Sequence, residues 1–462
     1  MKKFRKTRRL CLILCGLLLL LCFSGCADEQ TDGKTVLSVD GMPAESDEEN
    51  HANFMSTVEK FEAENPDVTL EPRNWGYAVD TFLPQAASNQ IPTVYGTFFT
   101  EVSKIIDAGF AADITDYYEK YGYADTIRPE ILDMVQKDGK VYMIPSSAYM
   151  MGLYINLDIF EEAGLLNEDG TAKIPQTFEE LAETAQLIHE RTGKVGFAFP
   201  TTNNYGGWHF MNIAWAYGTE FMKQENGKWI ATFDSPECAA ALQYLKDLKW
   251  EYNAMSANTL LSPNEALEMY ASGQAAMTFD SPPRDILTSR YGMSKDSISV
   301  GRIPAGPAGR FAVMGGNLKV IRDGATPEEM DAAFRWFEAI GISPNLTDTA
   351  KEHMENEYKT KAEQGDLVAF APYDHWADNS EYSNYRNEMI EKYRNADEKY
   401  FKEYVDAEGV TVRAEEPVAC QELYQVLDNC IQEVLNNQNA DVNTVLAEAA
   451  QQFQVNYLDK EE

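Results

Sequence analysis

Short apolar strands alternate with amphipathic helices near the start of the chain, and this alternation restricts the fold more than any other sequence feature. The patterns predict strands at residues 35–39, 68–70 and 93–95, and helices at residues 51–64 and 77–88. Strands that are separated by helices pair in parallel and lie between layers of helices. We therefore expect an α/β fold that is built on mostly parallel sheets.

Helix-start signals continue along the middle of the chain. A Ser or Thr followed by Glu three residues later fits a capping box, in which the two side chains satisfy free N–H groups of the first turn. Three such pairs are Thr177 with Glu180, Ser262 with Glu265, and Thr326 with Glu329. Asn226-Gly227 between apolar residues predicts a β-hairpin. From about Asn345 onward the sequence predicts mainly helix.

The first 25 residues have the pattern of a sorting signal. Six basic residues precede an apolar run at residues 10–23, which fits the hydrophobic region of a signal peptide and is short for a membrane span. The run ends Phe23-Ser24-Gly25-Cys26, and small residues before a cysteine match a bacterial lipobox, although Leu is usual where Phe23 stands. We expect residues 1–25 to be a lipoprotein signal peptide, Cys26 to carry lipid and residues 26–34 to form a tether. The alternative is an ordinary signal peptide with an incidental cysteine.

Charge and cysteine content exclude several classes of protein. The chain of 462 residues is long enough for two or more domains, and its net charge of −35 becomes −41 once the six basic residues of the signal are removed. Such acidity argues against nucleic acid as a partner and against wide contact with anionic lipid. Beyond Cys26 only Cys238, Cys420 and Cys430 remain, so we expect buried thiols and no disulfide framework.

Four segments, in order, carry a family pattern. They are Gly152-Leu153-Tyr154-Ile155-Asn156 with the helix and Pro-Gln-Thr-Phe motif that follow it to residue 181, residues 233–237, residues 272–280, and residues 301–307 with Gly315-Gly316 after them. Together with the signal in front, these segments resemble the family 1 extracellular solute-binding proteins, the group of maltose-binding protein and other carbohydrate receptors.

The resemblance implies an architecture and a function. It implies two lobes of type II periplasmic-binding-protein fold, with residues 35–147 plus 304–345 in lobe 1 and residues 148–303 plus 346–462 in lobe 2. The lobes would be joined by a hinge that the chain crosses several times and would close on a sugar or oligosaccharide. The protein would be a monomer, held by its lipid at the outer face of the cell membrane, and would deliver the ligand to the permease of an ABC importer. No enzyme activity, cofactor or metal is expected.

Candidate ligand contacts are aromatic and polar residues near strand ends, since a sugar offers apolar C–H faces and many hydroxyl groups. The resemblance places sugar contacts at Thr97, Tyr149 and Trp208. The full set of candidates is Trp75, Thr97, Phe98, Phe99, Tyr149, Trp208, Asp280, Gly315, Gly316, Asn317 and Trp376. Alternatives are core packing for the phenylalanines, a helix cap for Asp280 and a tight turn for Gly315-Gly316-Asn317. Pro283 replaces a stacking tryptophan of maltose-binding protein, which argues against maltodextrin as the ligand.

Two rival functions follow from the same sequence. A secreted glycosidase would need two carboxylates roughly 5 to 9 Å apart, but 74 acidic residues make candidate pairs uninformative. The sequence has no GxSxG, HExxH or P-loop motif, and its five histidines are scattered. The closer rival is the same architecture with a polyamine, peptide or phosphate ester as ligand. The sequence does not identify the sugar, its linkage or its length.

Overall fold

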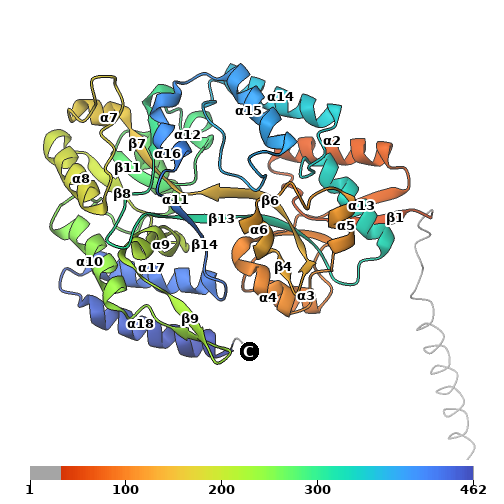
Figure 1. Ribbon diagram of the computed structural model, residues 1–462, viewed down its shortest axis with the longest axis horizontal. Helices are drawn as coiled ribbons and strands as arrows, with labels where there is room; N and C mark the ends of the chain where they lie inside the picture. Colours follow the sequence, from red (N-terminus) through yellow and green to blue (C-terminus); the bar gives the residue numbers. More distant parts are fainter. Residues whose placement is uncertain (1–32, 461–462) are drawn as a thin grey trace, which may run out of the picture.

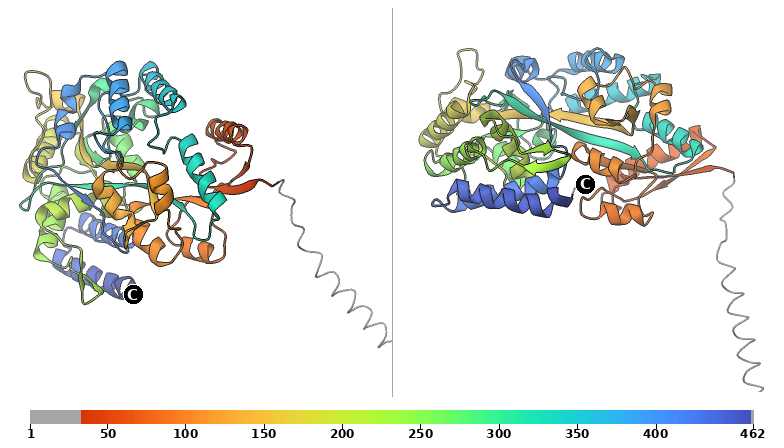
Figure 2. Two further views of the ribbon diagram at one scale, coloured as in Figure 1. Left: turned by 45° about the vertical axis from the view of Figure 1, so that its right-hand side comes forward. Right: turned by 60° about the horizontal axis from the view of Figure 1, so that its bottom comes forward.

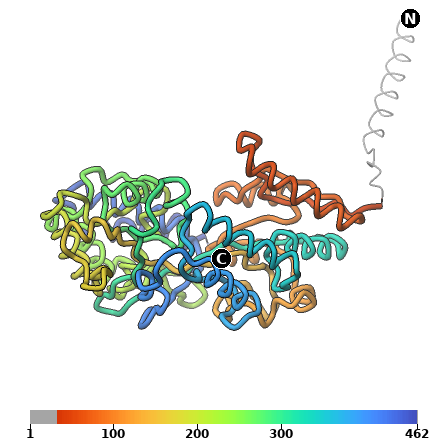
Figure 3. The backbone as a smooth tube through the Cα atoms, turned by 90° about the horizontal axis from the view of Figure 1, so that it is seen from above, coloured from red at the N-terminus to blue at the C-terminus, as the bar shows by residue number. Residues whose placement is uncertain are grey.

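The computed structural model describes residues 33–460, which fold into two lobes with separate hydrophobic cores (Figure 1). The core of the first lobe collects residues between 37 and 148, residues between 314 and 342, and Trp376. The core of the second lobe collects residues between 150 and 313 and between 367 and 458. Figure 3 shows the two lobes side by side from above. The expected signal peptide, Cys26 and most of the tether lie outside the described residues.

A six-stranded sheet forms the centre of the first lobe. Its strands are β1 (Thr35–Val39), β2 (Val68–Pro72), β3 (Val94–Phe98), β6 (Met143–Met150), β13 (Phe311–Ile321) and β14 (Thr411–Ala414). The order is β14-β13-β3-β1-β2, and β6 pairs with β13. β1 is parallel to β2 and β3, as the alternating pattern predicted, whereas β13 is antiparallel to β3 and β6.

Six helices belong to the first lobe. They are α2 (Glu48–Glu64), α3 (Phe82–Ala87), α4 (Val102–Asp107), α5 (Thr115–Lys120), α6 (Pro129–Met134) and α13 (Pro327–Ala339), with the 3-10 turn η1 (Phe99–Glu101) and the short strands β4 (Gln136–Lys137) and β5 (Lys140–Val141). The helix predicted at residues 77–88 is shorter than expected, because α3 begins only at Phe82. Pro84 lies in the first turn, where its ring would clash with the carbonyl of residue 80 if the helix began earlier.

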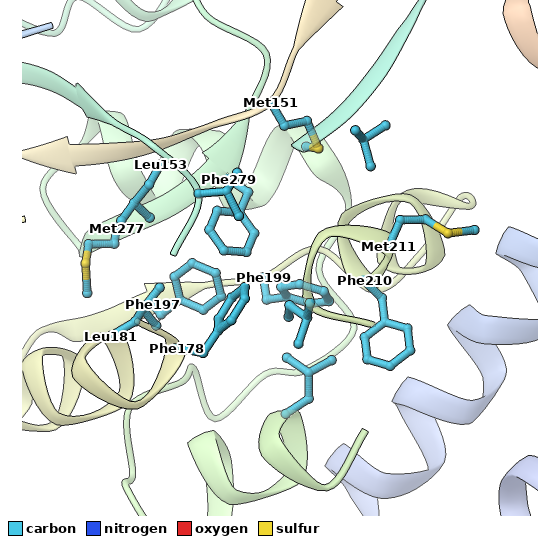
Figure 4. Close-up of a cluster of buried hydrophobic side chains, with 14 of the residues drawn as sticks. Met151, Leu153, Phe178, Leu181, Phe197, Phe199, Phe210, Met211, Met277 and Phe279 are labelled. Atoms are coloured by element: carbon cyan, nitrogen blue, oxygen red, sulfur yellow. The ribbon is translucent and has the colours of Figure 1, made fainter. Parts of the chain in front are cut away.

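The second lobe is built on a four-stranded sheet with the order β12-β7-β11-β8. Its strands are β7 (Gly152–Asn156), β8 (Val195–Ala198), β11 (Ala275–Asp280) and β12 (Ile298–Gly301), and its hairpin is β9 (Met222–Glu225) with β10 (Lys228–Ala231). β7 is antiparallel to both β11 and β12, and β8 is parallel to β11, so this sheet is mixed and not mostly parallel as expected. Its helices are α7 (Leu157–Glu162), α8 (Phe178–Thr192), α9 (Tyr205–Tyr217), α10 (Pro236–Trp250), α11 (Pro263–Ala271) and α12 (Ile286–Ser289), with the 3-10 turn η2 (Lys295–Ser297). Aromatic and methionine side chains fill this core (Figure 4).

Local sequence signals account for several of these elements. Ser262 with Glu265 and Thr326 with Glu329 form complete capping boxes. Thr177 accepts the N–H of Glu180, but the Glu180 carboxylate accepts the N–H of Gln176, so this third box is incomplete. The predicted hairpin is confirmed, since Asn226 and Gly227 join β9 to β10 with φ values of 52° and 79°.

The C-terminal segment is mainly helical, as predicted, and returns to both lobes (Figure 2). Its elements are α14 (Asp348–Gln364), α15 (Glu381–Tyr393), η3 (Glu398–Tyr400), α16 (Lys402–Asp406), β14, α17 (Cys420–Asn436), α18 (Val442–Asn456) and η4 (Leu458–Lys460). α17 packs against α9, α10 and α18 of the second lobe, while β14 extends the sheet of the first. Cys238, Cys420 and Cys430 are buried free thiols, as expected. Between residues 33 and 460, none of the helices is both long and apolar enough to span a bilayer.

Candidate ligand-binding cleft

The two lobes meet where β6 and β13 run side by side. Tyr149 of β6 pairs with Gly315 of β13. Ala148, one residue earlier, belongs to the first core, and Met150, one residue later, belongs to the second. A methyl group at Gly315 would lie 2.1 Å from the Tyr149 hydroxyl and 3.0 Å from Glu415 Oε2. Glycine is therefore required at this position so that the Tyr149 side chain can lie against β13. Since Gly315-Gly316-Asn317 lies inside a strand, the alternative of a tight turn is wrong.

The end of β3 contributes one exposed aromatic ring from the first lobe. Phe98 is 40% exposed and pairs with Asn317 across the strands. Phe99 is buried below Gly316, where a methyl group would lie 2.8 Å from its ring. Thr97 is 3% exposed and its hydroxyl makes no hydrogen bond with the described protein. Of these neighbours, Phe98 offers a free face, Phe99 belongs to the core, and Thr97 keeps an unused donor.

Tyr77 and Glu101 support Phe98 from below. The Tyr77 ring contacts Phe98 edge-on at 6.0 Å between centroids. Its hydroxyl donates to Glu101 Oε2 at 2.5 Å, and Lys104 Nζ lies 3.5 Å from the same oxygen. Burial and the adjacent Glu101 carboxylate raise the pKa of Tyr77 well above its usual range, so this hydroxyl remains a donor. The exposed ring therefore rests on a fixed, hydrogen-bonded base.

The start of α9 positions the second lobe's aromatic residues. Asp428 of α17 accepts the backbone N–H groups of Asn204 at 2.8 Å and of Gly207 at 2.7 Å, which satisfies free donors at the first turn. A methyl group at Gly207 would lie 2.5 Å from the Tyr424 backbone, so glycine allows α9 to pack closely against α17. Trp208 lies at the end of this first helical turn.

Three rings from the two lobes' junction form an edge-to-face cluster. The Trp208 ring lies 5.6 Å from Tyr149 and 5.3 Å from Tyr205, with interplanar angles of 88° and 85°. Tyr205 is exposed and Trp208 is partly buried. The buried Trp208 indole N–H faces the Tyr149 hydroxyl but makes no hydrogen bond of good geometry with it. An unpaired buried donor is costly, so a ligand oxygen would find a ready partner here.

Asp280 ends β11 beside this cluster. Its carboxylate accepts the N–H of Ser281 at 2.7 Å and lies 3.4 Å from Arg284 Nε. The helix-cap alternative is wrong for α12, because that helix begins after Asp285. His209 of α9 contacts the carbonyl of Phe279 at 3.0 Å through Nε2, and so connects the start of α9 with the end of β11. Asp280, Tyr205 and Trp208 are therefore connected within the second lobe.

Glu415 was not predicted from the sequence, although it directly follows β14. Its Oε1 accepts the Tyr424 hydroxyl at 2.7 Å, and its Oε2 faces Gly315 beside the Tyr149 hydroxyl. Burial, with a smaller contribution from Glu101 of the first lobe, raises the pKa of Glu415 to about 7. The available sequence signal was the position of a polar residue immediately after a strand. This signal does not indicate which distant residues Glu415 contacts in the fold.

Two predicted tryptophans lie away from the crossing strands. Trp75 packs edge-on against the buried Tyr95 and donates its indole N–H to Gln85 Oε1 at 2.8 Å. Trp376 is 2% exposed and lies against Tyr123 and Tyr382 in the first core. The structure therefore brings together Phe98, Tyr149, Trp208, Asp280 and the Gly315-Gly316-Asn317 segment, with Thr97 beside Phe98. It places Phe99 and Trp376 in cores, and Trp75 at the edge of one.

A polar hollow of about 410 Å³ adjoins the start of α9 and lies between the lobes. The first lobe supplies Val79 and Asp80. The second supplies Thr202, Asn203, Asn204, Gln421, Glu422, Gln425, Asp428, Asn429 and Gln432. Gln421 also donates to Thr100 Oγ1 at 3.2 Å, and Lys104 lies 3.8 Å from Glu422, so the lobes touch beside the hollow. Across the described part of the chain, no group of three or more His, Cys, Asp or Glu residues is arranged to hold a metal ion.

Comparison with known protein sequences finds a matching family and several relatives. The family described as bacterial extracellular solute-binding protein matches residues 56–354. The multiple sugar-binding protein of Streptococcus mutans is 24% identical over 293 residues, which are 60% of this chain and 64% of that protein. The diacetylchitobiose-binding protein of Streptomyces coelicolor is 22% identical over 257 residues, 54% of this chain and 57% of that protein. The chain thus spans about six-tenths of the length of these curated relatives.

Solved structures share the whole fold. The GacH receptor of Streptomyces glaucescens, solved without ligand and with acarbose, has a TM-score of 0.67 at 19% identity over 92% of this chain and 99% of that chain. Maltose-bound MalE3 of T. maritima has a TM-score of 0.65 at 18% identity over 91% of this chain and 99% of that chain. At such low identity these similarities establish the fold alone, which is the two-lobed α/β fold that the sequence predicted.

Proposed function

This chain belongs to the bacterial extracellular solute-binding protein family, and from that premise we propose that it captures a sugar or short oligosaccharide between its lobes and delivers it to an ABC importer. The observation that carries the proposal is the ring cluster at the junction of the lobes. The Trp208 ring lies 5.6 Å from Tyr149 and 5.3 Å from Tyr205, and Phe98 of the other lobe is exposed. Flat rings of this kind suit the apolar C–H faces of a sugar.

The polar groups around these rings fit the hydroxyl groups of a sugar. Thr97 keeps a buried hydroxyl without a partner, the Trp208 indole N–H faces the Tyr149 hydroxyl, and Asp280 and Asn317 supply further acceptors and donors at strand positions. Six amide side chains line the adjoining hollow, and an amide offers both a donor and an acceptor. A ligand with many neutral hydroxyl groups would satisfy these groups without burying an unpaired charge.

Closure would follow from the way in which the lobes are connected. β6 and β13 pass between the two cores, and the Tyr149–Gly315 pair lies at the boundary. A ligand that contacts both lobes favours the closed form by the difference in its affinity for the closed and open forms. The closed protein with its ligand would then dock on the permease. This step is supported by the family and by the relatives named above, which are binding proteins.

Location and anchoring complete the proposal. The family is extracellular, and we propose that Cys26 is lipidated after removal of residues 1–25 and anchors a monomer to the outer face of the cell membrane. The lipobox-like sequence before Cys26 supports this step. Labelling of the protein with palmitate in cells, and loss of both the label and membrane association in Cys26→Ser, would support the anchor. Unchanged labelling in that variant would contradict it.

Isothermal titration calorimetry after a thermal-shift screen of mono- and oligosaccharides tests the proposed ligand class. A saccharide that binds the folded state should raise the melting temperature. Trp208→Ala should weaken its binding by about tenfold or more, roughly 1.4 kcal/mol, because the stacking face and the unused indole donor are removed. Trp229→Ala, in the hairpin strand β10, is the matched control and should leave the affinity unchanged. Binding that is equally strong in both variants would exclude the ring cluster as the site.

A further inference from the structure

Glu415 is a carboxyl group at the junction of the lobes for which the described residues supply no cation. No Lys, Arg or His side chain within residues 33–460 forms an ion pair with it. Arg413, two residues away, is directed toward Glu220 at 3.0 Å and Glu416 at 3.4 Å. Lys104 is shared by Glu101 at 3.5 Å and Glu422 at 3.8 Å. Glu415 is partly buried and lacks the countercharge that a carboxylate withdrawn from water normally requires.

The groups that face Glu415 are neutral or acidic. Tyr424 of α17 donates its hydroxyl to Oε1, and the Tyr149 hydroxyl of β6 lies beside Oε2 at Gly315. Cys420 of α17 and Glu101 of the first lobe are its other titratable neighbours. Burial raises the pKa of Tyr149, Tyr424 and Cys420 well above their usual ranges, so none of them carries a charge near pH 7. The side of Glu415 next to the aromatic cluster therefore lacks a positive neighbour.

Other carboxylates around the cleft differ from Glu415 in this respect. Asp280 has Arg284 at 3.4 Å, and Asp40 has Lys319 at 2.6 Å. In the adjoining hollow, Glu422 has Lys104 at 3.8 Å, and Asp428 accepts the backbone N–H groups of Asn204 and Gly207. Glu415 therefore differs from Asp280, Asp40 and Glu422 in having no cationic side chain beside it among residues 33–460.

From this arrangement we infer that the ligand carries a protonated amine, which makes it an amino sugar or an oligosaccharide containing one, with the ammonium group against Glu415. The inference rests on the proposed function and narrows its ligand class. Glu415 would act as the specificity-determining residue, while Tyr149 and Trp208 would present ring faces or edges around the same group. The same charge disfavours uronic acids and sugar phosphates, since like charges at close range cost binding energy.

A bound ammonium group would also supply the positive charge that Glu415 lacks. Without ligand, burial favours the protonated form, as the raised pKa of about 7 indicates. An ammonium group would stabilise the carboxylate by a charge-assisted hydrogen bond and lower its pKa. A neutral hydroxyl group in the same place would gain only an ordinary hydrogen bond, so the amine should be preferred over its neutral parent.

Calorimetry with paired ligands at pH 7 tests the inference. The neutral probes are glucose and cellobiose, and the aminated probes are glucosamine, 6-amino-6-deoxyglucose and the β-1,4-linked glucosamine dimer. At least one aminated probe should bind the wild-type protein tenfold or more tightly than its neutral parent. Glu415→Gln, which keeps an acceptor for Tyr424, should abolish that preference. Glu416→Gln is the matched control, because this neighbouring carboxyl already has Arg413 as a partner, and it should keep the preference.

The outcomes separate the inference from the proposed function. If no aminated probe binds tenfold more tightly than its neutral parent, the inference is overturned and sugar capture still stands. A preference for amines that survives Glu415→Gln would overturn the role of Glu415. Absence of binding to every saccharide, neutral or aminated, would overturn the proposed function and the inference with it. The comparison on the wild-type protein holds even if a variant fails to fold.

Discussion

Tyr149, Gly315 and Glu415 contact one another at the junction of the lobes. This contact needs a residue without a side chain at position 315 and places a carboxyl group beside the tyrosine. The glycine leaves room for the tyrosine side chain, and the carboxyl group fills the remaining space beside it. The contact connects β13, which contributes residues to both cores, with Glu415, which follows β14. A change of one side chain here therefore affects the fold and the candidate site together, unlike a change on an exposed surface.

Stability should depend on pH through Glu415. Its pKa is raised from 4.5 in the unfolded chain to about 7 in the fold, so between these values the folded state binds more protons and stability falls as the pH rises. At about 1.4 kcal/mol per pKa unit, this costs at most roughly 3 kcal/mol above pH 7. Glu415→Gln removes the ionisation, so its stability relative to wild type should increase from pH 5 to pH 8. Urea unfolding at both pH values measures this, and a difference that is independent of pH would contradict it.

At the residue level, the family resemblance and the strand ends selected several residues that the structure brings together. Tyr149, Trp208, Asp280 and Gly315 come together in the structure, and their contact with a ligand stays a prediction. Glu415 could not be found in this way, because it meets Tyr149 and Glu101 only after distant segments pack. Trp376 lies in a polar stretch of sequence yet is buried, since the core into which it packs is built from residues far away in the chain.

At the scale of elements, α9 and α17 determine where the aromatic cluster lies. The first turn of α9 is held by Asp428 and by the glycines that let it approach α17. Local signals predicted the capped helices and the hairpin correctly, because caps and two-residue turns depend on adjacent residues. The eleven-residue strand β13 had no comparable signal, since its extent is set by pairing with β3, β6 and β14.

Asp428→Ala should disturb the cluster through the start of α9. Two backbone N–H groups would lose their acceptor, which should lower the free energy of unfolding by about 2–3 kcal/mol and weaken saccharide binding by about tenfold as Trp208 shifts. Asp441→Ala is the matched control, because this residue caps α18 through the N–H of Thr444 and lines no part of the cleft. It should cost about 1 kcal/mol with unchanged affinity. Urea unfolding and calorimetry check both variants, and equal affinities would contradict the positioning role.

At the scale of the whole molecule, two separate cores joined by long shared strands suit a motion of one lobe against the other. The sequence predicted a two-lobed α/β fold from the alternation of strands and helices and from the four family segments. It did not predict that β7 pairs antiparallel with β11 and β12, because strand direction depends on how distant segments return to the sheet. The predicted lobe boundaries stay a prediction. The hollow between the lobes and the rings beside it are formed by both lobes, so a ligand that fills them would contact both at once.

A crystal structure with the saccharide that most raises the melting temperature tests the central claim most directly. We predict an unaltered saccharide between the lobes, in contact with Trp208 from the second lobe and Phe98 from the first. A saccharide bound on the outside of one lobe, or one cleaved at a glycosidic bond within the cleft, would contradict the account.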